Sequence, residues 1–302
     1  MGLLSSIKRF YETKYKALLL ITLLLIPAAL GMLAYSKLAT GEYFQKGVSL
    51  KGGDTYTIPI GTPVDLEALQ NSLSQRLPES DITVRGISEL GTLSGIIIEA
   101  SDVEEAALVA ALADEGVVVV AGDYSKESIG SSLGESFFRQ TILALIAAFV
   151  MMAIVVFITF RNLLPSLYVV LAVISTVLET LAIASMLEIK ISTAGIAAFL
   201  MLIGYSVDTD ILLTSRALQR KEGALMDRIY SAMKTGITMT LTALITTSIA
   251  YVFSDSDVIK QIMLILTIGL LFDLVNTWIQ NVGILRFYLE RKERKSTEAH
   301  HG

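Results

Sequence analysis

Four carboxylates interrupt long apolar stretches of the sequence: Glu179, Asp208, Asp210 and Asp273. An ionisable side chain inside a membrane span costs roughly 2.5–3.5 kcal/mol on insertion scales, and such residues commonly carry protons or bind ions. A carboxyl group that meets a cation in an apolar setting changes its protonation as the pair forms and breaks. The four acids therefore predict a proton-linked conformational cycle. The alternative interpretation is structural, with each acid hydrogen-bonded to a neighbouring helix.

Asp208 and Asp210 lie near one end of the apolar run 191–213, whose centre is near Leu202. At 1.5 Å per residue, Asp208 is about 9 Å and Asp210 about 12 Å from that centre. A membrane half-thickness of about 15 Å puts Asp208 well inside the hydrocarbon, whereas Asp210 is close enough to its edge to reach water. Two residues subtend about 200° on a helix, so the two side chains point in nearly opposite directions. Asp208 is therefore the first candidate for a proton carrier, and the two acids are not expected to form a close pair.

Polar side chains also follow two other apolar runs. A stripe at helical spacing must face the interior of a helix bundle, and one such stripe consists of Asp273, Asn276, Thr277 and Gln280. A second set of small hydroxyl residues, which permit close helix contact, consists of Thr235, Thr238, Thr242 and Thr246. Lys234 precedes this set at a depth similar to that of Asp210, which makes it a candidate partner for an acid. Simple helix packing and surface anchoring by Lys234 are the alternatives.

The composition describes an integral membrane protein, because 53% of the 302 residues are hydrophobic and gather into long blocks. The chain has no cysteine, and both of its histidines lie in the polar tail at 300 and 301. Thiolate catalysis, disulfides and a buried imidazole are therefore excluded, and no catalytic residue, metal or cofactor is expected. No phosphate-binding loop of the Walker type is present, so direct use of ATP is not expected either.

Six spans are expected, at residues 17–36, 139–161, 163–187, 191–213, 236–253 and 258–285. A cleaved signal peptide is the competing interpretation of the first run, although that run is longer than a usual signal core. With residues 1–16, 214–235, 286–302 and Arg161 placed inside, the inner side holds 15 lysines and arginines, against 3 in the short outer loops and at the outer entrance of span two. Because basic residues concentrate on the cytoplasmic side, both termini are expected there, and residues 37–138 outside the cell membrane.

Residues 37–138 form one polar block with 6 basic and 16 acidic residues, which argues against a nucleic-acid partner. Strands are expected at 54–60, 82–87, 94–100 and 116–121. One helix is expected from Thr62 to about Leu77, and another, to Ala113, after a capping box that starts at Ser101. The order β-α-β-β-α-β predicts a small ferredoxin-like α+β domain beside the bundle of six transmembrane helices.

With these features the chain resembles the SecF branch of the SecD/SecF protein-export family, within the resistance-nodulation-division superfamily. The first motif of that family is matched by the segment that contains Gly47, Gly52 and Gly53, and the second by the approach to span two at Gly130 and Gly134. The third is the Gly-Tyr-Ser segment of span four, matched by Gly204, Tyr205, Ser206 and the later Arg216. The match is closest to the archaeal pattern.

This resemblance implies a non-enzymatic auxiliary subunit of the Sec translocase that works with a SecD-like partner, a SecY/SecE-type channel and translocating polypeptide. It also implies coupling to the proton-motive force, with Asp208, Asp210, Lys234, Glu179 and Asp273 as candidate carriers or switching partners. Three positions depart from the family pattern: Ser49 replaces an acid, Asp208-Thr209-Asp210 replaces Asn-Asp-Thr, and Lys234 replaces arginine. The alternative functions are efflux of a small molecule or lipid by a related transporter, and passive assembly of translocon components.

Overall fold

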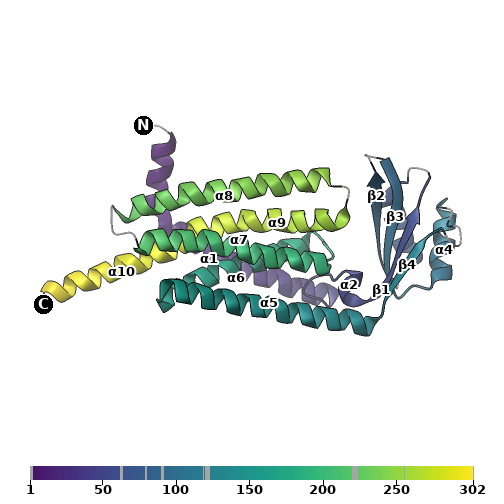
Figure 1. Cartoon of the computed structure of the whole chain (residues 1–302), viewed down its shortest axis with the longest axis horizontal. Helices are drawn as coiled ribbons and strands as arrows, with labels where there is room; N and C mark the ends of the chain where they lie inside the picture. The colour runs from purple at the N-terminus through teal and green to yellow at the C-terminus, as the bar shows by residue number, and fades with distance from the viewer. Residues whose placement is uncertain are drawn as a thin grey trace.

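A computed structural model describes residues 3–61, 64–78, 80–89, 92–117, 119, 123–219, 224–254 and 256–301. Side chains are described throughout these ranges except at 3–7, 88–89, 92, 219 and 292–301. A bundle of long helices carries a small α+β domain across one of its ends (Figure 1).

Six helical segments in the described part of the chain are long and apolar enough to cross a membrane, as the sequence predicts. They are α1 (Leu3–Thr40), α5 (Ser131–Phe160), α6 (Leu163–Met186), α7 (Thr193–Gln219), α8 (Leu225–Phe253) and a composite rod. The rod joins α9 (Asp257–Val275), the π-helical turn η1 (Asn276–Asn281) and α10 (Val282–His301). About half of the apolar stretch of α6 and of α7 is buried, against far less of α5 and α8. Helices α6 and α7 are therefore the most enclosed of the six segments.

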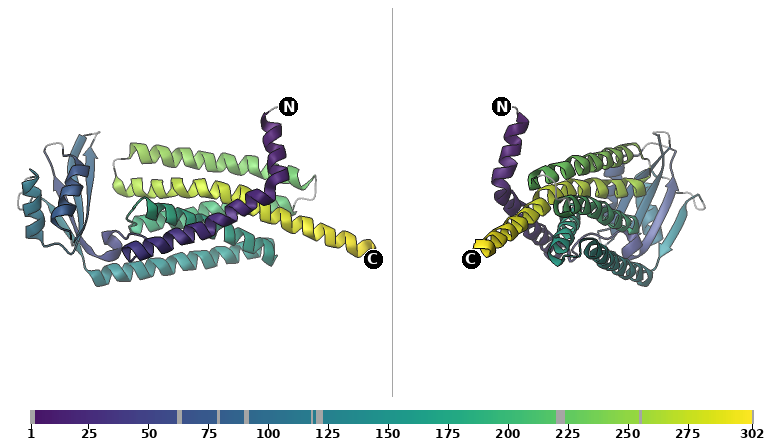
Figure 2. Two further views of the ribbon diagram at one scale, coloured as in Figure 1. Left: turned by 180° about the vertical axis from the view of Figure 1, so that it is seen from behind. Right: turned by 60° about the vertical axis from the view of Figure 1, so that its left-hand side comes forward.

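Both termini lie at the end of the bundle opposite to the α+β domain (Figures 1 and 2). The first turns of α1 cross the end of α8, where the Lys8 ammonium lies 4.4 Å from the centre of the Tyr230 ring. Arg286 on α10 donates a 2.9 Å hydrogen bond to the carbonyl of Glu12 on α1. These contacts tie the two ends of the chain to the same end of the bundle.

The α+β domain follows the short helix α2 (Val48–Lys51) and has one four-stranded sheet in its described part. Its elements are β1 (Gly53–Pro59), α3 (Leu66–Arg76), β2 (Asp81–Glu89), β3 (Thr92–Ser101), α4 (Glu105–Asp114) and β4 (Ser125–Ile129). The strands lie in the order β2-β3-β1-β4, and every neighbouring pair is antiparallel. Alternate residues of β1 and β3, including Tyr56 and Ile98, pack on Leu73 and Leu112 of the two helices. The helices thus cover one face of the sheet.

Three local predictions in this domain are wrong. The helix expected from Thr62, which itself lies outside the described residues, begins at Leu66, because the carboxylate of Asp65 caps the amides of Glu67 and Ala68. The helix α4 begins after Glu104 with no side-chain cap, since Ser101 is held in β3. The apolar run 116–121 forms no strand where it is described. It supplies the buried Val117 to the core, while the polar segment Ser125–Ile129 pairs with β1.

The polar strand β4 is held by Lys126, whose ammonium lies 3.1 Å from Asp54 of β1 and 2.8 Å from Glu105 of α4. Partial burial raises the pKa of the Asp54 carboxyl, but hydrogen bonds from Ser128, Lys126 and Tyr56 outweigh it and leave that pKa below its usual value. Hydrogen bonds from Lys126 and Tyr124 lower the pKa of Glu105. Both acids are therefore ionised at neutral pH, and ion pairs replace the apolar contacts that this edge of the sheet lacks.

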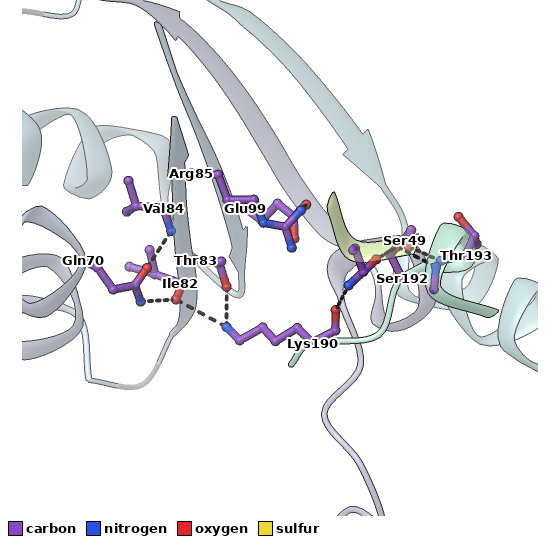
Figure 3. A network of polar contacts seen from close by, with 12 residues as sticks. Ser49, Gln70, Ile82, Thr83, Val84, Arg85, Glu99, Lys190, Ser192 and Thr193 are labelled. Atoms are coloured by element: carbon purple, nitrogen blue, oxygen red, sulfur yellow. Dashed lines mark hydrogen bonds and ion pairs between the residues drawn. The ribbon is translucent and has the colours of Figure 1, made fainter. Parts of the chain in front are cut away.

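Lys190, in the turn between α6 and α7, joins the bundle to the sheet (Figure 3). Its ammonium contacts the carboxylate of Asp81 and donates to the Thr83 hydroxyl at 2.5 Å and to the Ile82 carbonyl at 3.3 Å, all on β2. Gln261 of α9 donates to the Lys190 carbonyl at 2.5 Å. The domain is thus docked by polar contacts on the turn before α7, and Gln261 of α9 holds that turn.

We predict that Lys190→Met loosens this docking, because β2 loses three hydrogen bonds from one ammonium group. The loss of charged hydrogen bonds at a half-exposed site is worth about 1 kcal/mol, or roughly fivefold in the opening equilibrium. Amide exchange of β2 in the detergent-solubilised chain should accelerate by that factor. The matched control is Lys260→Met, because Lys260 lines one cavity together with Lys190 but makes no described ion pair. Equal exchange in the two variants would contradict the role of Lys190.

Candidate functional site within the membrane bundle

Asp208 and Asp210 lie on opposite faces of α7, as the helical spacing predicts. Asp208 is exposed on the surface of the chain together with Tyr205. Asp210 is 0% exposed and lies on the buried face with Ser206 and Thr209. The expectation that Asp210 reaches interfacial water is therefore wrong, because α7 packs that face against α9 and η1.

The buried face of α7 brings Asp210 next to Asp273 of α9. Asn281 donates to Asp210 Oδ1 at 2.8 Å, and Thr209 donates to Asp273 Oδ2 at 3.2 Å. The Thr277 hydroxyl lies 3.4 Å from Asp273 Oδ1 and also contacts Asp210, so it connects the two carboxyl groups. No ion pair joins either acid to a lysine or arginine among the described residues. Two neighbouring carboxyl groups in an apolar interior do not both ionise readily.

The predicted polar stripe faces the bundle interior, and it reaches α6 as well as α7. Asn276 donates to Glu179 Oε2 at 2.8 Å and to the Thr176 hydroxyl at 3.0 Å. Gln280 donates to the Ser175 hydroxyl at 3.0 Å. Glu179 is therefore joined to the stripe through an amide rather than through the carboxyl pair.

Several buried oxygen atoms of this interior network have no described hydrogen-bond donor. Oxygen atoms with no described donor belong to Glu179, Asp210, Asn276, Gln280 and Asn281. A buried acceptor left without a donor costs about 1–3 kcal/mol. A proton on a carboxyl group converts one acceptor into a donor, so protonation of one acid would give one of these oxygens a partner.

Asp208 lines a cavity of about 480 Å³ between α7 and α8, on the exposed face of these two helices. Hydroxyl groups line the same cavity, from Thr209, Thr238, Thr240, Thr242, Thr246 and Thr247. The exposed threonines Thr238, Thr242 and Thr246 each donate to the carbonyl four residues earlier on α8, at 2.8–2.9 Å. Thr209 also donates to Asp273, so its hydroxyl connects the cavity of Asp208 with the interior carboxyl pair.

The two predicted cations lie away from the carboxyl pair. Lys234 is exposed on α8 and forms no described ion pair with Asp208 or Asp210 in this structure, so its role as a partner for an acid stays a prediction. Arg216 donates to the carbonyl and hydroxyl of Ser231 at 2.5 and 3.1 Å and to the Thr235 hydroxyl at 3.1 Å. It joins α7 to α8 near one end of the bundle.

The motif glycines gather where the α+β domain joins the bundle, except Gly204 on α7. Gly47 donates to the Ile191 carbonyl at 2.9 Å, just before α7. Gly52 and Gly53 have φ of +92° and +140° in the turn into β1. A Cβ on Gly134 of α5 would lie 2.5 Å from the Gly52 amide nitrogen, whereas one on Gly130 would meet nothing within 4 Å. The chain therefore needs bare backbone at Gly52 and Gly134, where the two segments touch.

Sequence reasoning missed Asn281, which makes the closest described contact to Asp210. An α-helical pattern from Asn276 selects Gln280 and leaves Asn281 turned away, so periodicity gave no signal for it. An uncharged amide inside an apolar run was the available signal. Ser175 and Thr176 were missed because small hydroxyl residues are common in membrane helices.

Comparisons with known proteins identify the family to which this chain is related. The family model "Protein export membrane protein SecD/SecF, C-terminal" matches residues 112–291. The SecF of Pyrococcus furiosus is 36% identical over 291 residues, which is 96% of each chain. The SecF of Methanothermobacter thermautotrophicus is 36% identical over 275 residues, covering 89% of this chain and 92% of that protein.

Two solved structures share the fold. The crystal structure of the translocon-associated SecDF from Thermus thermophilus has a TM-score of 0.67 and 18% identity, over 91% of this chain. A second SecDF structure, in a super-membrane-facing form, has a TM-score of 0.66 and 20% identity, over 94% of this chain. The chain spans only 38% of the first SecDF chain and 39% of the second. The sequence relatives and the family model together show that the chain belongs to the SecF family of protein-export membrane proteins.

Proposed function

We propose that the chain works with a second, SecD-like membrane subunit as an auxiliary unit of the Sec translocase, and that it couples export to proton entry. The observation that carries the proposal is the exposed polar face of α7 and α8. A carboxylate and three threonine hydroxyls lie on the outer surface of helices that are long and apolar enough to cross a membrane.

Lipid is a poor neighbour for this face. A charged Asp208 in contact with hydrocarbon costs roughly 2.5–3.5 kcal/mol on insertion scales. Small hydroxyl residues such as Thr238 and Thr242 are typical of surfaces where membrane helices meet. The chain matches 38% of a SecDF chain, which leaves room there for a second half of similar size. A SecD-like bundle is therefore the partner that we place against this face.

The proton step follows from the two sites and their link. The partner encloses Asp208 in an apolar setting, where its charge is costly and protonation is favoured. Thr209 lines the same cavity and donates a hydrogen bond to Asp273. The change of charge at Asp208 is therefore transmitted through this hydroxyl to Asp273 and Asp210. Lys234 on the same exposed face is placed to meet an acid once the two bundles move against each other. Glu179 and the amides of η1 spread the change to α6.

We place the α+β domain outside the cell membrane, where it meets polypeptide leaving a SecY/SecE-type channel. The excess of lysine and arginine near the opposite end of the bundle supports this orientation, as do two termini at that end. The element order β-α-β-β-α-β and the strand order β2-β3-β1-β4 favour a ferredoxin-like domain. Residues 37–138 are the proposed outer segment.

Site-specific photo-crosslinking tests the partner. A photoreactive residue at position 242, on the hydroxyl face, should capture a larger six-span chain with a related outer domain in native membranes. The same probe at Leu143, which is 66% exposed on α5, should capture no such chain. Capture of only a second copy of this protein at 242 would favour the self-contained efflux transporter instead.

A further inference from the structure

The rod α9–η1–α10 changes its helical register beside the carboxyl pair. In a continuous α-helix, Asn281 would lie about 140° around the axis from Asn276. A π-helical turn pairs residue i with i+5, so Asn281 is brought above Asn276 on the same face. Asn276, Thr277, Gln280 and Asn281 are all at most 1% exposed. Single π-turns inside α-helices are frequent at functional sites.

The register change gives Asp210 its hydrogen-bond donor. Asn281 Nδ2 lies 2.8 Å from Asp210 Oδ1, while Asp210 Oδ2 has no described donor. The titratable group that faces Asp210 is Asp273 of α9, whereas Glu179 of α6 is bonded to Asn276 at the other end of the same turn. An amide that occupies Oδ1 leaves Oδ2 as the oxygen free to accept a proton.

Two neighbours hold the π-turn from outside. The indole of Trp278, which is 3% exposed, lies against Gly236 of α8, where an added Cβ would collide with the ring. The Tyr11 hydroxyl of α1 donates to the Trp278 carbonyl, within the turn. Helices α1 and α8 thus fix the turn that presents Asn281.

We propose that Asn281 is a positioning residue for Asp210: it occupies Oδ1 and so fixes Oδ2 as the atom that takes and releases the proton. This inference rests on the proposed function, in which the change at Asp208 reaches the Asp210–Asp273 pair, and it adds that the pair itself takes up a proton during the cycle. The π-turn is the device that makes the contact, since an α-helical register would turn Asn281 away.

The test uses the chain reconstituted with its SecD-like partner and follows carboxyl groups by infrared difference spectroscopy over a pH titration. The C=O band of protonated Asp210 is assigned by its loss in Asp210→Asn. Asn281→Leu keeps the branched shape of the side chain but removes the donor, so the band should shift to higher wavenumber and its titration midpoint should move to higher pH. The control is Gln280→Leu, equally buried but bonded to Ser175, which should leave band and midpoint in place.

The outcomes separate the inference from the function on which it rests. If Asp210→Asn removes no band and leaves proton-driven export intact, the protonation of the pair is wrong. If Asp210→Asn removes the band but Asn281→Leu moves neither the band nor the midpoint, the positioning role is overturned. If Asn281→Leu does not accumulate, Tyr11→Phe, which frees the Trp278 carbonyl at the edge of the bundle, should produce the same shifts to a smaller extent. Unmoved bands there also overturn the inference.

Discussion

Replacing Asp208 by asparagine should abolish the stimulation of protein export by a proton gradient while leaving membrane insertion and partner binding intact. Asparagine keeps the shape and polarity of the side chain but cannot take up a proton, so the charge change that drives the cycle is lost. The assay compares export rates in energised and de-energised membrane vesicles. In the variant the two rates should be equal, at the level of the de-energised wild type.

Asp227→Asn is the matched control, because Asp227 is also an exposed acid near the α7–α8 side but lies in the first turn of α8. It should keep the full stimulation. Unchanged stimulation in Asp208→Asn would contradict the proposal that Asp208 couples export to proton entry. If substitutions at Asp208, Asp210 and Asp273 were all tolerated, passive assembly of the translocon would become the better account, with the acids purely structural.

A single methyl group at Gly134 should prevent the correct joining of the α+β domain to the bundle. The added Cβ would lie 2.5 Å from the Gly52 nitrogen and 2.8 Å from the Lys51 carbonyl carbon. Both contacts are with backbone, so no side chain can move aside. Overpacking of this kind costs about 1–3 kcal/mol or more, which is a large fraction of the stability of a small domain.

Gly134→Ala should therefore lower the thermal unfolding midpoint in detergent and expose residues near 45–55 and 125–135 to protease. Gly130→Ala is the matched control from the same motif, since its Cβ would meet nothing within 4 Å and its φ is −60°. The control should unfold and resist protease like the wild type. Similar behaviour of the two variants would show that the close backbone approach does not matter.

Membership of the SecF family makes the chain a multi-pass membrane protein with an accessory, non-enzymatic role in protein export. The proposed partner surface, proton route and orientation extend that role to named residues. The proposed proton route also gives a role to one departure from the family pattern, the segment Asp208-Thr209-Asp210. Thr209 stands between the two aspartates and links the outer cavity to the interior pair.

Helical geometry explains which parts of the site could be predicted from sequence. The opposite directions of Asp208 and Asp210, and the burial of the stripe from Asp273, follow from a period of 3.6 residues and needed no tertiary information. Asn281 could not be found in this way, because the π-turn breaks that period. The neighbours of Asp210 were also unpredictable, since depth along one helix does not say which face another helix covers.

In the α+β domain, too, some features could be predicted from the sequence and others could not. The order of its strands and helices was predicted from alternating and capped segments. The last strand was placed too early, on an apolar run, because propensity favoured Val117 and its neighbours. The structure instead pairs β4 through Lys126, a residue whose ion pairs with Asp54 and Glu105 depend on chain segments far apart in sequence.

The most direct measurement of the central claim follows protons rather than exported protein. Proteoliposomes that hold this chain, its SecD-like partner and the channel would enclose a pH-sensitive dye, under an imposed gradient and with a translocating polypeptide. We predict polypeptide-dependent proton entry in the wild type and in Asp227→Asn, and none in Asp208→Asn. Equal proton entry in Asp208→Asn and the wild type would contradict the assignment of Asp208 as the group that carries the proton.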